Sequence, residues 1–382
     1  MSTTSVRAYL VTLCVLSVSL LISLPATALD GEIEMVEETS TPRMLSVEGF
    51  VDAYYSYDFG DPNDNVKPLL FNYNRHNEFS INVAMLSVGY EQDRMRGRIG
   101  LMAGTYSEYN YAAELPQVRP IYEAWGGYEL FENVWWDAGL FPSHIGWESV
   151  HSTSNITLTR SLAAANSPFF LAGTRLYWTP SDTLTLGLTL ANGWQNVAET
   201  NDSKGIGTQV TWSPSDVFTI NSSTWVSDEI AAGSRLRLFH DLYGVVNLGR
   251  ASFIAGLDTG MQRTPDGAEK EWDIWWTAAA LARVNLTNVV ATGARVEYFH
   301  DPGQVIIVTG NLNGIRTLGA SLNLDFALAE SAVFRLEGRM FRDARELYML
   351  GKNPSQTNIA ATASLTLAFD HLLDLTPSAS EE

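Results

Sequence analysis

The residue types that most often carry out chemistry are sparse in this chain. Its 382 residues include six histidines, at positions 76, 144, 151, 240, 300 and 371, and none form a His-Glu-x-x-His pair. On this spacing alone, we expect no metal site. There is no phosphate-binding glycine loop, no Gly-x-Ser-x-Gly elbow and no dinucleotide fingerprint, so no cofactor is expected.

One short segment has a spacing that could support nucleophilic catalysis. It reads His151-Ser152-Thr153-Ser154-Asn155, so that Ser152 or Ser154 could be a nucleophile and His151 a base. It only approaches the His-x-Ser-Asn-Gly segment of outer-membrane phospholipases, since it has an extra residue and Ile156 in place of glycine. We therefore do not predict an enzyme, and a hydrolase is kept as the weaker alternative.

The charged residues alternate regularly with apolar residues, and this pattern predicts the fold. Within 333–341, Arg335, Glu337 and Arg339 alternate with apolar residues. Because successive side chains of a strand point to opposite faces, this segment predicts a strand with one apolar face and one ionic face. A long series of such strands in an exported chain is typical of a barrel with lipid outside and water inside.

The alternation recurs along the chain and predicts an all-β, transmembrane, up-and-down antiparallel barrel of about sixteen strands. The predicted strands cover 45–59, 77–92, 96–106, 121–131, 133–142, 168–179, 183–193, 204–213, 217–227, 235–247, 251–262, 271–285, 289–300, 314–327, 331–342 and 355–369. About 9–11 residues suffice for a tilted strand to cross a bilayer. The connections alternate between short turns and long loops, which places the short turns and both chain ends on the periplasmic side.

The ends of the chain predict export. Residues 1–28 have a positive start, an apolar stretch and an Ala-x-Ala-like end, as in a signal peptide. We divide the rest into an acidic periplasmic segment (29–43), the barrel (44–370) and a polar tail (371–382). Cys14 lies in the predicted signal, so no cysteine remains for disulfides or catalysis. A net charge of −19 argues against nucleic acid as a partner.

The residues between the apolar positions are predicted to line the lumen. These pore-lining candidates are Glu48, Asp52, Arg98, Glu123, Arg175, Arg235, Arg237, Arg295, Glu297, Arg335, Glu337 and Arg339. A lysine or arginine at mid-depth on the lipid face costs about 2–4 kcal/mol, so energetics favours this sorting. Two interpretations stay open at each position: the charges select ions, or they only pair with one another across strands.

The longest connection, 143–167, carries the constriction candidates His144, Glu148, His151 and Arg160, and 157–165 could form a short helix. Such a loop could fold inward and narrow a channel, or stay on the outer surface. Aromatic residues near strand ends predict two interfacial belts, one with Trp178 and Trp212 and the other with Trp225, Trp272 and Tyr298. The alternative is that these rings fill a soluble core.

A further signal comes from the segments 71–79, 101–106, 110–114, 137–146, 158–162, 192–195 and 239–244. Taken together, they resemble the OmpL-like β-barrel porin family of bacterial outer membranes. The resemblance covers nearly the whole chain after the signal and implies an outer-membrane channel, without established ligand-binding residues. One departure is that Phe369, where such barrels usually end on an aromatic residue, is followed by Asp370 and a polar tail.

The function predicted from the sequence is a porin that lets small hydrophilic solutes diffuse through a charged, water-filled lumen in the bacterial outer membrane. Barrels of 16–18 strands leave an aqueous channel, whereas eight strands are filled by side chains. The expected partners are the lipid bilayer and solutes or ions, and a homotrimer is suggested by analogy with general porins. The main alternative is a non-conducting barrel that acts as an adhesin or structural anchor.

Overall fold

The structure is a computed structural model that describes residues 43–229, 235–311, 313–351 and 353–376. The predicted signal peptide (1–28), nearly all of the acidic segment (29–43) and the end of the polar tail lie outside the described residues. No described helix is both long and apolar enough to cross a membrane.

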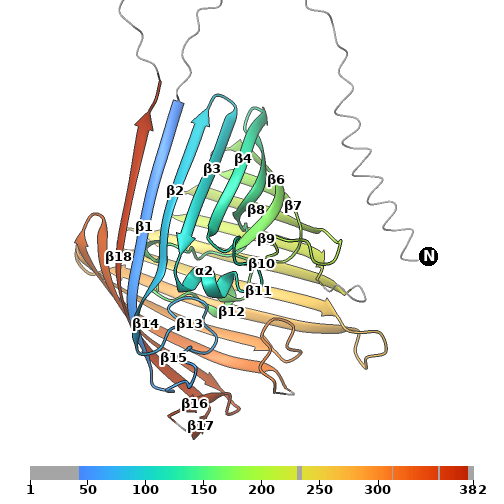
Figure 1. Ribbon diagram of the computed structural model, residues 1–382, viewed down its shortest axis with the longest axis vertical. Coiled ribbons are helices and arrows are strands. Elements are labelled where there is room, and N and C mark those ends of the chain that lie inside the picture. The colour runs from blue at the N-terminus through green and yellow to red at the C-terminus, as the bar shows by residue number, and fades with distance from the viewer. Residues whose placement is uncertain (1–42, 230–234, 312, 352, 377–382) are drawn as a thin grey trace, which may run out of the picture. The chain divides into compact units, whose positions relative to one another are not determined.

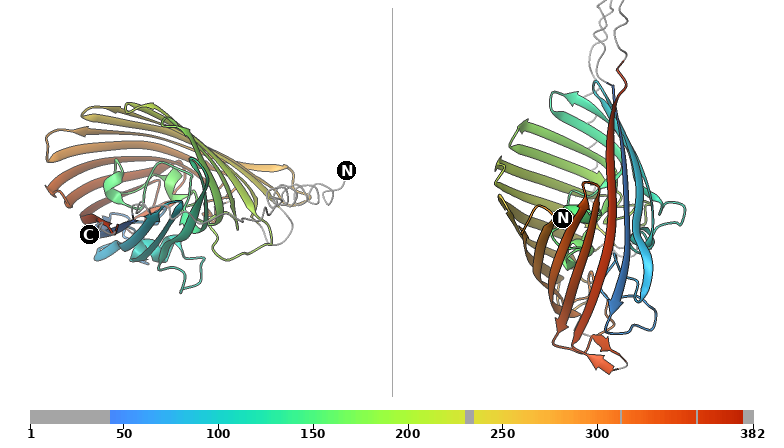
Figure 2. Two further views of the ribbon diagram at one scale, coloured as in Figure 1. Left: turned by 90° about the horizontal axis from the view of Figure 1, so that it is seen from above. Right: turned by 90° about the vertical axis from the view of Figure 1, so that its left-hand side faces the viewer.

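Sixteen strands close into one barrel in which every strand pairs antiparallel with its neighbours (Figure 1, Figure 2). The strands are β1 (Arg43–Asp58), β2 (Glu78–Gln92), β3 (Met95–Ala103), β4 (Ile121–Phe131), β5 (Val134–Pro142), β6 (Phe170–Ser181), β7 (Leu184–Ala191), β8 (Gly205–Ser215), β9 (Phe218–Asp228), β10 (Leu236–Leu248), β11 (Ala251–Arg263), β12 (Trp272–Asn285), β13 (Val290–Asp301), β14 (Ile315–Ala329), β15 (Ala332–Asp343) and β18 (Thr357–Asp374). The first strand, β1, closes the barrel by pairing with the last, β18, from Met44 opposite Asp374 to Asp58 opposite Ala360. The predicted fold class is confirmed.

A few small elements lie within the long connections. They are α2 (Thr105–Asn110), the 3₁₀ turn η1 (Ser152–Ser154), α3 (Leu162–Ala165) and the hairpin of β16 (Tyr348–Leu350) with β17 (Asn353–Ser355). The predicted helix over 157–165 is wrong for its first five residues, since only Leu162–Ala165 is helical. Ser161 caps this turn by accepting a hydrogen bond from the Ala164 N–H, whereas the preceding residues bond to the barrel wall instead.

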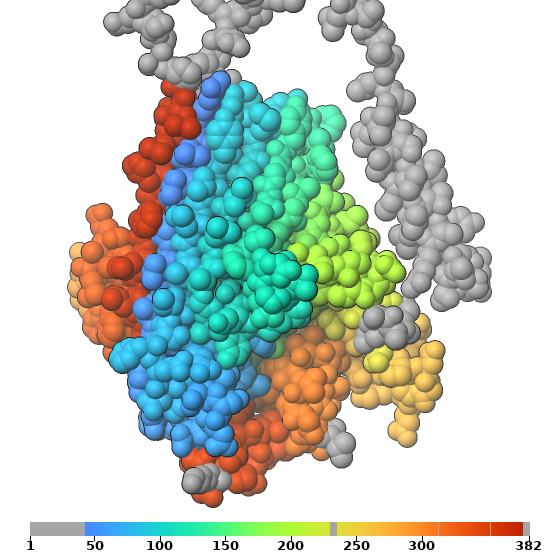
Figure 3. Space-filling model, viewed as in Figure 1, coloured from blue at the N-terminus to red at the C-terminus, as the bar shows by residue number. Residues whose placement is uncertain are grey.

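The barrel has its apolar side chains outside, the reverse of a soluble protein. On β14, Leu318, Leu322 and Leu324 are 42%, 60% and 43% exposed. Their neighbours Asn323 and Asp325 are 1% and 3% exposed and face inward. This order is stable only where hydrocarbon covers the outer face, because exposed leucines alone would be costly in water. The space-filling view shows the strands β1 to β4 as a continuous wall (Figure 3).

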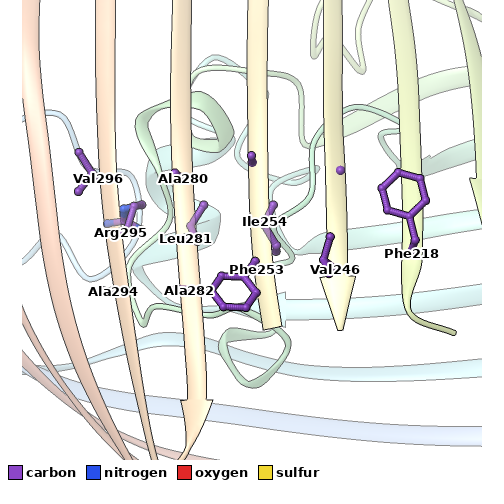
Figure 4. Close-up of a pocket in the computed structure, with 12 residues that line it drawn as sticks. Phe218, Val246, Phe253, Ile254, Ala280, Leu281, Ala282, Ala294, Arg295 and Val296 are labelled. Carbon is purple, nitrogen blue, oxygen red and sulfur yellow. The ribbon is translucent and has the colours of Figure 1, made fainter. Parts of the chain in front are cut away.

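A shallow groove of about 580 Å³ crosses the outer face of strands β9 to β13 (Figure 4). Its lining includes the small residues Ala255, Ala280 and Ala294 together with the larger Phe218 and Phe253. Apart from Arg295, whose side chain is buried and bonds to the loop inside the barrel, all lining residues are apolar, which fits contact with acyl chains.

The aromatic residues near the short turns face outward, as the belt prediction requires. Trp178 and Trp212 are 49% and 47% exposed. Near the long loops, Tyr298 on the outer face of β13 packs against Trp276 with ring centroids 5.2 Å apart.

The placement of Trp225 in the outer belt is wrong. Trp225 is fully buried on the inner face of β9, and its Nε1 donates a hydrogen bond to Ser227 Oγ at 2.7 Å. The ring fits there because Gly205 on β8 has no side chain; a Cβ at that position would lie 2.1 Å from the Trp225 ring.

Candidate functional site

The connection between β5 and β6 enters the barrel and lies against the inner wall formed by β13, β14 and β15 (Figure 2). Three arginines of this wall donate hydrogen bonds to carbonyl oxygens of the loop. Arg295 Nη1 reaches Thr159 O at 2.5 Å, and Arg339 Nη1 reaches Arg160 O at 2.8 Å. Arg335 Nη2 bonds to the carbonyl oxygens of residues 155 and 156 at 3.1 and 3.2 Å.

Acceptors on the same wall bind the loop's backbone N–H groups. The N–H of Leu158 donates to Asn323 Oδ1 at 3.0 Å, and the N–H of Thr159 donates to Glu337 Oε2 at 2.5 Å. The N–H of Leu162 donates to Glu297 Oε2 at 2.5 Å. Buried backbone groups must be paired. In a sheet a neighbouring strand provides the hydrogen-bond partners, whereas in this loop side chains of the barrel wall provide them.

The wall residues also pair with one another. Arg339 Nη2 lies 2.7 Å from Glu297 Oε1, and Arg295 Nη2 lies 3.3 Å from Glu337 Oε1. All four side chains are at most 3% exposed. The structure therefore places the predicted pore-lining residues of β13 and β15 beneath the loop, where their charges hold the loop and do not face open water.

Among the constriction candidates, Glu148 and Arg160 belong to this buried network. Glu148 Oε2 accepts a hydrogen bond from the Ser161 N–H at 2.8 Å, and its Oε1 lies 3.7 Å from Arg295 Nη1. Burial raises the pKa of Glu148, although Arg295 opposes this shift. The Arg160 guanidinium lies over the Phe169 ring at 3.5 Å, donates to Asn110 Oδ1 at 3.0 Å and has its pKa lowered by burial.

The two histidines of the loop lie against different walls. His144 is 7% exposed, and its Nε2 lies 3.3 Å from the carbonyl oxygen of Thr224 on β9. Burial lowers the pKa of His144 to about 4. His151 packs edge-on against Phe50 of β1, with ring centroids 4.8 Å apart, and burial also lowers its pKa.

The wall of β1 to β6 carries charges that remain partly exposed. Arg98 links two acids, with its Nε 2.5 Å from Glu123 Oε1 and its Nη1 2.7 Å from Glu48 Oε1. The Arg98 side chain is 22% exposed and that of Glu48 is 36% exposed. These three predicted residues therefore form one group that water can reach.

A second group on this wall has more basic than acidic residues. The buried Asp137 carboxylate accepts from Arg175 Nε at 3.0 Å and from Arg96 Nη2 at 2.9 Å. Arg175 and Arg96 are 13% and 26% exposed. Of these three residues, only Arg175 was predicted to line the lumen. The alternation of β3 and β5 places Arg96 and Asp137 on the same face and is the signal that identifies them.

The remaining predicted wall residues have local partners. Asp52 is fully buried and accepts a hydrogen bond from Thr366 Oγ1 at 3.3 Å. Arg237 Nη2 donates to Gln262 Oε1 at 2.7 Å. Arg235 lies just before β10, and its backbone N–H donates to Asp228 Oδ1 at 2.8 Å.

Two cavities border the loop inside the barrel. The first, of about 300 Å³, is lined by Tyr106, Tyr122, Trp147, Glu148, Ser149 and Tyr243 among others. Since Tyr122 belongs to β4 and Tyr243 to β10, this cavity lies between distant parts of the wall. The second, of about 380 Å³, is lined by Glu48, Phe50 and His151 together with acids of the short-turn end.

A buried apolar cluster also lies within the barrel, which was not predicted from the sequence. It includes Phe141, Trp225, Phe239, Trp275 and Phe341, all at most 5% exposed. Alternation places these residues on the inner face but gives no sign that loops would cover them. The cluster reduces the open cross-section near the long loops.

The geometry does not bring together the residues of the hydrolase alternative. His151 Nδ1 lies 3.4 Å from Ser149 Oγ, whereas Ser152 Oγ lies 3.3 Å from Thr366 Oγ1. Among the described residues there is no group of three or more His, Cys, Asp or Glu that could hold a metal ion.

Comparison with solved structures supports the barrel architecture. An anion-selective porin from Comamonas acidovorans aligns with a TM-score of 0.60 and 8% identity over 86% of this chain and 100% of its own. The outer membrane channel DcaP of Acinetobacter baumannii aligns with a TM-score of 0.59 and 12% identity over 85% and 97%. Salmonella typhi OmpF aligns with a TM-score of 0.55 and 10% identity over 86% and 98%.

At these identities the structures show a common fold. No curated protein matches the chain. A family model described as "Putative beta-barrel porin-2, OmpL-like" matches residues 44–369, which is most of the chain. The match covers the barrel except for the first residue of β1 and the last residues of β18. With the closed barrel and its apolar exterior, this match shows that the chain belongs to the OmpL-like family of outer-membrane β-barrel porins.

Proposed function

We propose that this porin lets small hydrophilic solutes diffuse passively through a path bounded by the loop 143–167 on one side and by the wall of β1 to β6 on the other. The observation that carries the proposal is the fixed position of the loop. Its backbone is bonded to β13, β14 and β15 and its His151 packs on Phe50 of β1, while the charges of Arg98, Glu48 and Arg175 on the wall of β1 to β6 remain partly exposed.

In this proposal the predicted pore-lining residues have two roles. Arg295, Glu297 and Arg339 hold the constriction loop, so they set the width of the path. Arg98 and Arg175 touch water and act as the electrostatic filter, because charged groups at a narrow point favour ions of opposite sign.

The buried apolar cluster around Trp225 and Trp275 favours a second candidate, a barrel that inserts into the membrane without conducting. Such a barrel would serve as an adhesin or anchor. Planar-bilayer recording of the purified chain in potassium chloride separates the two candidates. We expect discrete, ohmic conductance steps; protein that inserts stably and never conducts would support the anchor and contradict the channel.

The proposal extends to assembly and location. We propose export by the predicted signal peptide, insertion in the bacterial outer membrane and assembly as a homotrimer, by analogy with general porins. Fractionation of cell envelopes tests the location, and light scattering in detergent tests the assembly. A monomer at all concentrations would contradict the trimer but leave the channel proposal intact.

A further inference from the structure

Two arginines without an acidic partner lie together on the outer face of the barrel, at its long-loop end. Arg316 is the second residue of β14 and Arg342 is the last but one of β15. Both are exposed, whereas their neighbours Thr317 and Phe341 are 0% and 1% exposed. Because successive side chains of a strand alternate between the two faces, both arginines point outward.

The register of the sheet brings the two arginines close to each other. Arg342 pairs with Leu318 of β14, and Arg316 precedes Leu318 by two residues on the same face. Such diagonal neighbours lie about 7–8 Å apart, which is within reach of two long side chains. Two like charges at this separation repel each other unless an anion lies between them.

Neither guanidinium has an ion pair or a hydrogen bond within the residues that the structure describes. Asp343 follows Arg342 in the chain but is buried on the inner face, where it pairs with Arg345 Nε at 2.8 Å. Arg263 provides a contrast, since it is an exposed arginine at the end of β11 that pairs with Glu271 at 2.9 Å. In a chain with a net charge of −19, two adjacent unpaired arginines point to an anion that the chain itself does not provide.

The surroundings of the two arginines indicate the depth at which this anion lies. Next to them the outer face is apolar, with Leu318 and Val296 42% and 57% exposed. On β13, His300 pairs in register with Arg316, and its ring stacks on Trp276 with centroids 5.7 Å apart. Aromatic rings and arginines beside an apolar band are typical of the zone where lipid headgroups meet hydrocarbon. We therefore expect the missing anion at the depth of the headgroups.

The pair of arginines is confined to β14 and β15. Near the same end of the barrel, the outward positions of β12 and β18 carry Ile274 and Ile359, which are 55% and 42% exposed. A general need for charge at this rim would place arginines on these strands too. Two unpaired arginines on adjacent strands fit a single binding site instead.

We propose that Arg316 and Arg342 bind the phosphate group of a lipid whose acyl chains cover the apolar wall of β13 to β15. The guanidinium fork matches the geometry of phosphate oxygens, and two forks can bind a single phosphate from two sides. The acyl chains bury the leucine and valine side chains of the wall at the same time. This site adds a specific lipid ligand to the proposed channel and does not depend on conduction.

The test is a lipid titration of the detergent-solubilised protein, read by native mass spectrometry. Phosphatidic acid is the probe, since its headgroup is a phosphate alone. Phosphatidylcholine with the same acyl chains is the reference, since its choline cancels the phosphate charge. We expect wild type to bind phosphatidic acid roughly tenfold more tightly, which corresponds to about 1.4 kcal/mol. Equal binding of the two lipids by wild type would overturn the proposal.

Substitutions locate the site. Arg316→Gln and Arg342→Gln each remove one fork, and we expect either variant to lose most of the preference, as for loss of a hydrogen bond between charged groups. Arg316→Lys should keep part of it, because an ammonium retains the charge but not the fork. The matched control is Arg263→Gln, which removes the same charge at the same end of the barrel and should bind phosphatidic acid like wild type. Equal weakening by Arg263→Gln and Arg316→Gln would show that binding follows net charge alone, which contradicts the site.

Inorganic phosphate separates a lipid site from a phosphate site. We expect an equimolar amount of phosphate not to displace phosphatidic acid, because contact of the acyl chains with the wall adds to the affinity. Displacement would show that the arginines recognise free phosphate and would overturn the lipid assignment. Migration on gels with and without heating verifies that each variant is folded.

This site and the proposed channel fail in different ways. Protein that never conducts, yet binds phosphatidic acid with a preference that Arg316→Gln abolishes, contradicts the channel and supports the lipid site. Protein that conducts ions and binds both lipids equally supports the channel and overturns the lipid site.

Discussion

Arg339 on β15 donates a hydrogen bond from Nη1 to the carbonyl oxygen of Arg160 at 2.8 Å. A wall residue and a loop residue, 179 positions apart in the chain, are thus joined inside the barrel. The alternation that places Arg339 on the inner face is typical of a water-facing charge. Its partners are the Arg160 carbonyl and the Thr159 hydroxyl of the loop together with Glu297 of the wall, so this arginine stabilises the loop.

Removing this arginine should release the loop. Arg339→Gln leaves Glu297 with one fewer cationic partner in a buried site, and breaking a buried ion pair costs about 3–5 kcal/mol. We expect a lower unfolding temperature and a higher single-channel conductance, measured by gel migration after heating and by bilayer recording. Arg263→Gln on β11 is the control, because Arg263 and its partner Glu271 are both exposed. Equal conductance of Arg339→Gln and wild type would show that the loop does not limit ion flow.

Arg175 should set the ion preference. It shares Asp137 with Arg96, so Arg175→Gln removes the excess positive charge from this part of the wall. A unit charge about 4 Å from the path is worth about 1 kcal/mol in water, or roughly fivefold in local ion concentration. We expect the reversal potential in a salt gradient to move toward that of the cation. Arg263→Gln, which alters an exposed ion pair with Glu271, should leave it unchanged.

His144 should make the barrel sensitive to acid. Its pKa is about 4 in the folded chain because of burial, against about 6.5 for a free histidine. Between these values the unfolded chain binds more protons, so acidification from pH 6.5 to pH 4 lowers the free energy of unfolding, by about 3 kcal/mol at most. His144→Gln should remove this part of the pH dependence in urea unfolding.

Glu148 changes the free energy of unfolding in the opposite direction to His144. Because burial raises the pKa of Glu148, acidification stabilises the folded protein through this residue. This contribution is present in both wild type and His144→Gln. The difference between the two unfolding curves therefore isolates His144, and curves that stay parallel from pH 6.5 to pH 4 would contradict the assignment.

Two glycines should respond in opposite ways to alanine. At Gly260 on β11 a Cβ would lie 2.0 Å from the buried Trp275 ring, so Gly260→Ala should destabilise the barrel by about 1–3 kcal/mol. At Gly338 on β15 a Cβ meets nothing within 4 Å, and Gly338→Ala should be neutral or stabilising by up to about 1 kcal/mol. Comparison of their unfolding midpoints checks the inward position of Trp275.

A charged residue on the lipid-facing surface should destabilise the barrel. Val296, in the middle of β13, is 57% exposed on the outer face. Val296→Lys should cost about 2–4 kcal/mol in a bilayer. Val308→Lys, at a 79% exposed position of a long loop, is the control and should be tolerated. If both variants refold into vesicles with equal stability, the outer face does not contact hydrocarbon.

The sixteen barrel strands could be predicted from the sequence because apolar and polar residues alternate along each of them. The cost of burying a charge in lipid enforces this alternation. At β15, for example, Arg335 and Leu336 cannot exchange faces without placing a charge in lipid. Most strand ends were predicted to within three residues because short turns punctuate the pattern. The end of the last strand was wrong: β18 continues past Phe369 to Asp374, so that the first residues of the predicted polar tail (371–382) pair with β1.

What fills the barrel could not be predicted in the same way. Alternation identified Arg295 and Arg339 as inward-facing, but a loop without a period gives no sign that it will bond to them. Trp225 was assigned to the outer belt because depth alone was considered; its position beside Ser223 and Ser227 on the inner face of β9 was the stronger signal. The hairpin of β16 and β17 is too short for any periodicity to reveal.

The pairing of β1 with β18 has a consequence for biogenesis. Until β18 arrives, the edge of β1 presents a row of unpaired amide and carbonyl groups, which hydrocarbon cannot solvate. A nascent or truncated polypeptide therefore has no stable resting state within the bilayer. Stable insertion must therefore await the C-terminal strand, so that loss of the last few residues of the chain would compromise the whole barrel and not β18 alone.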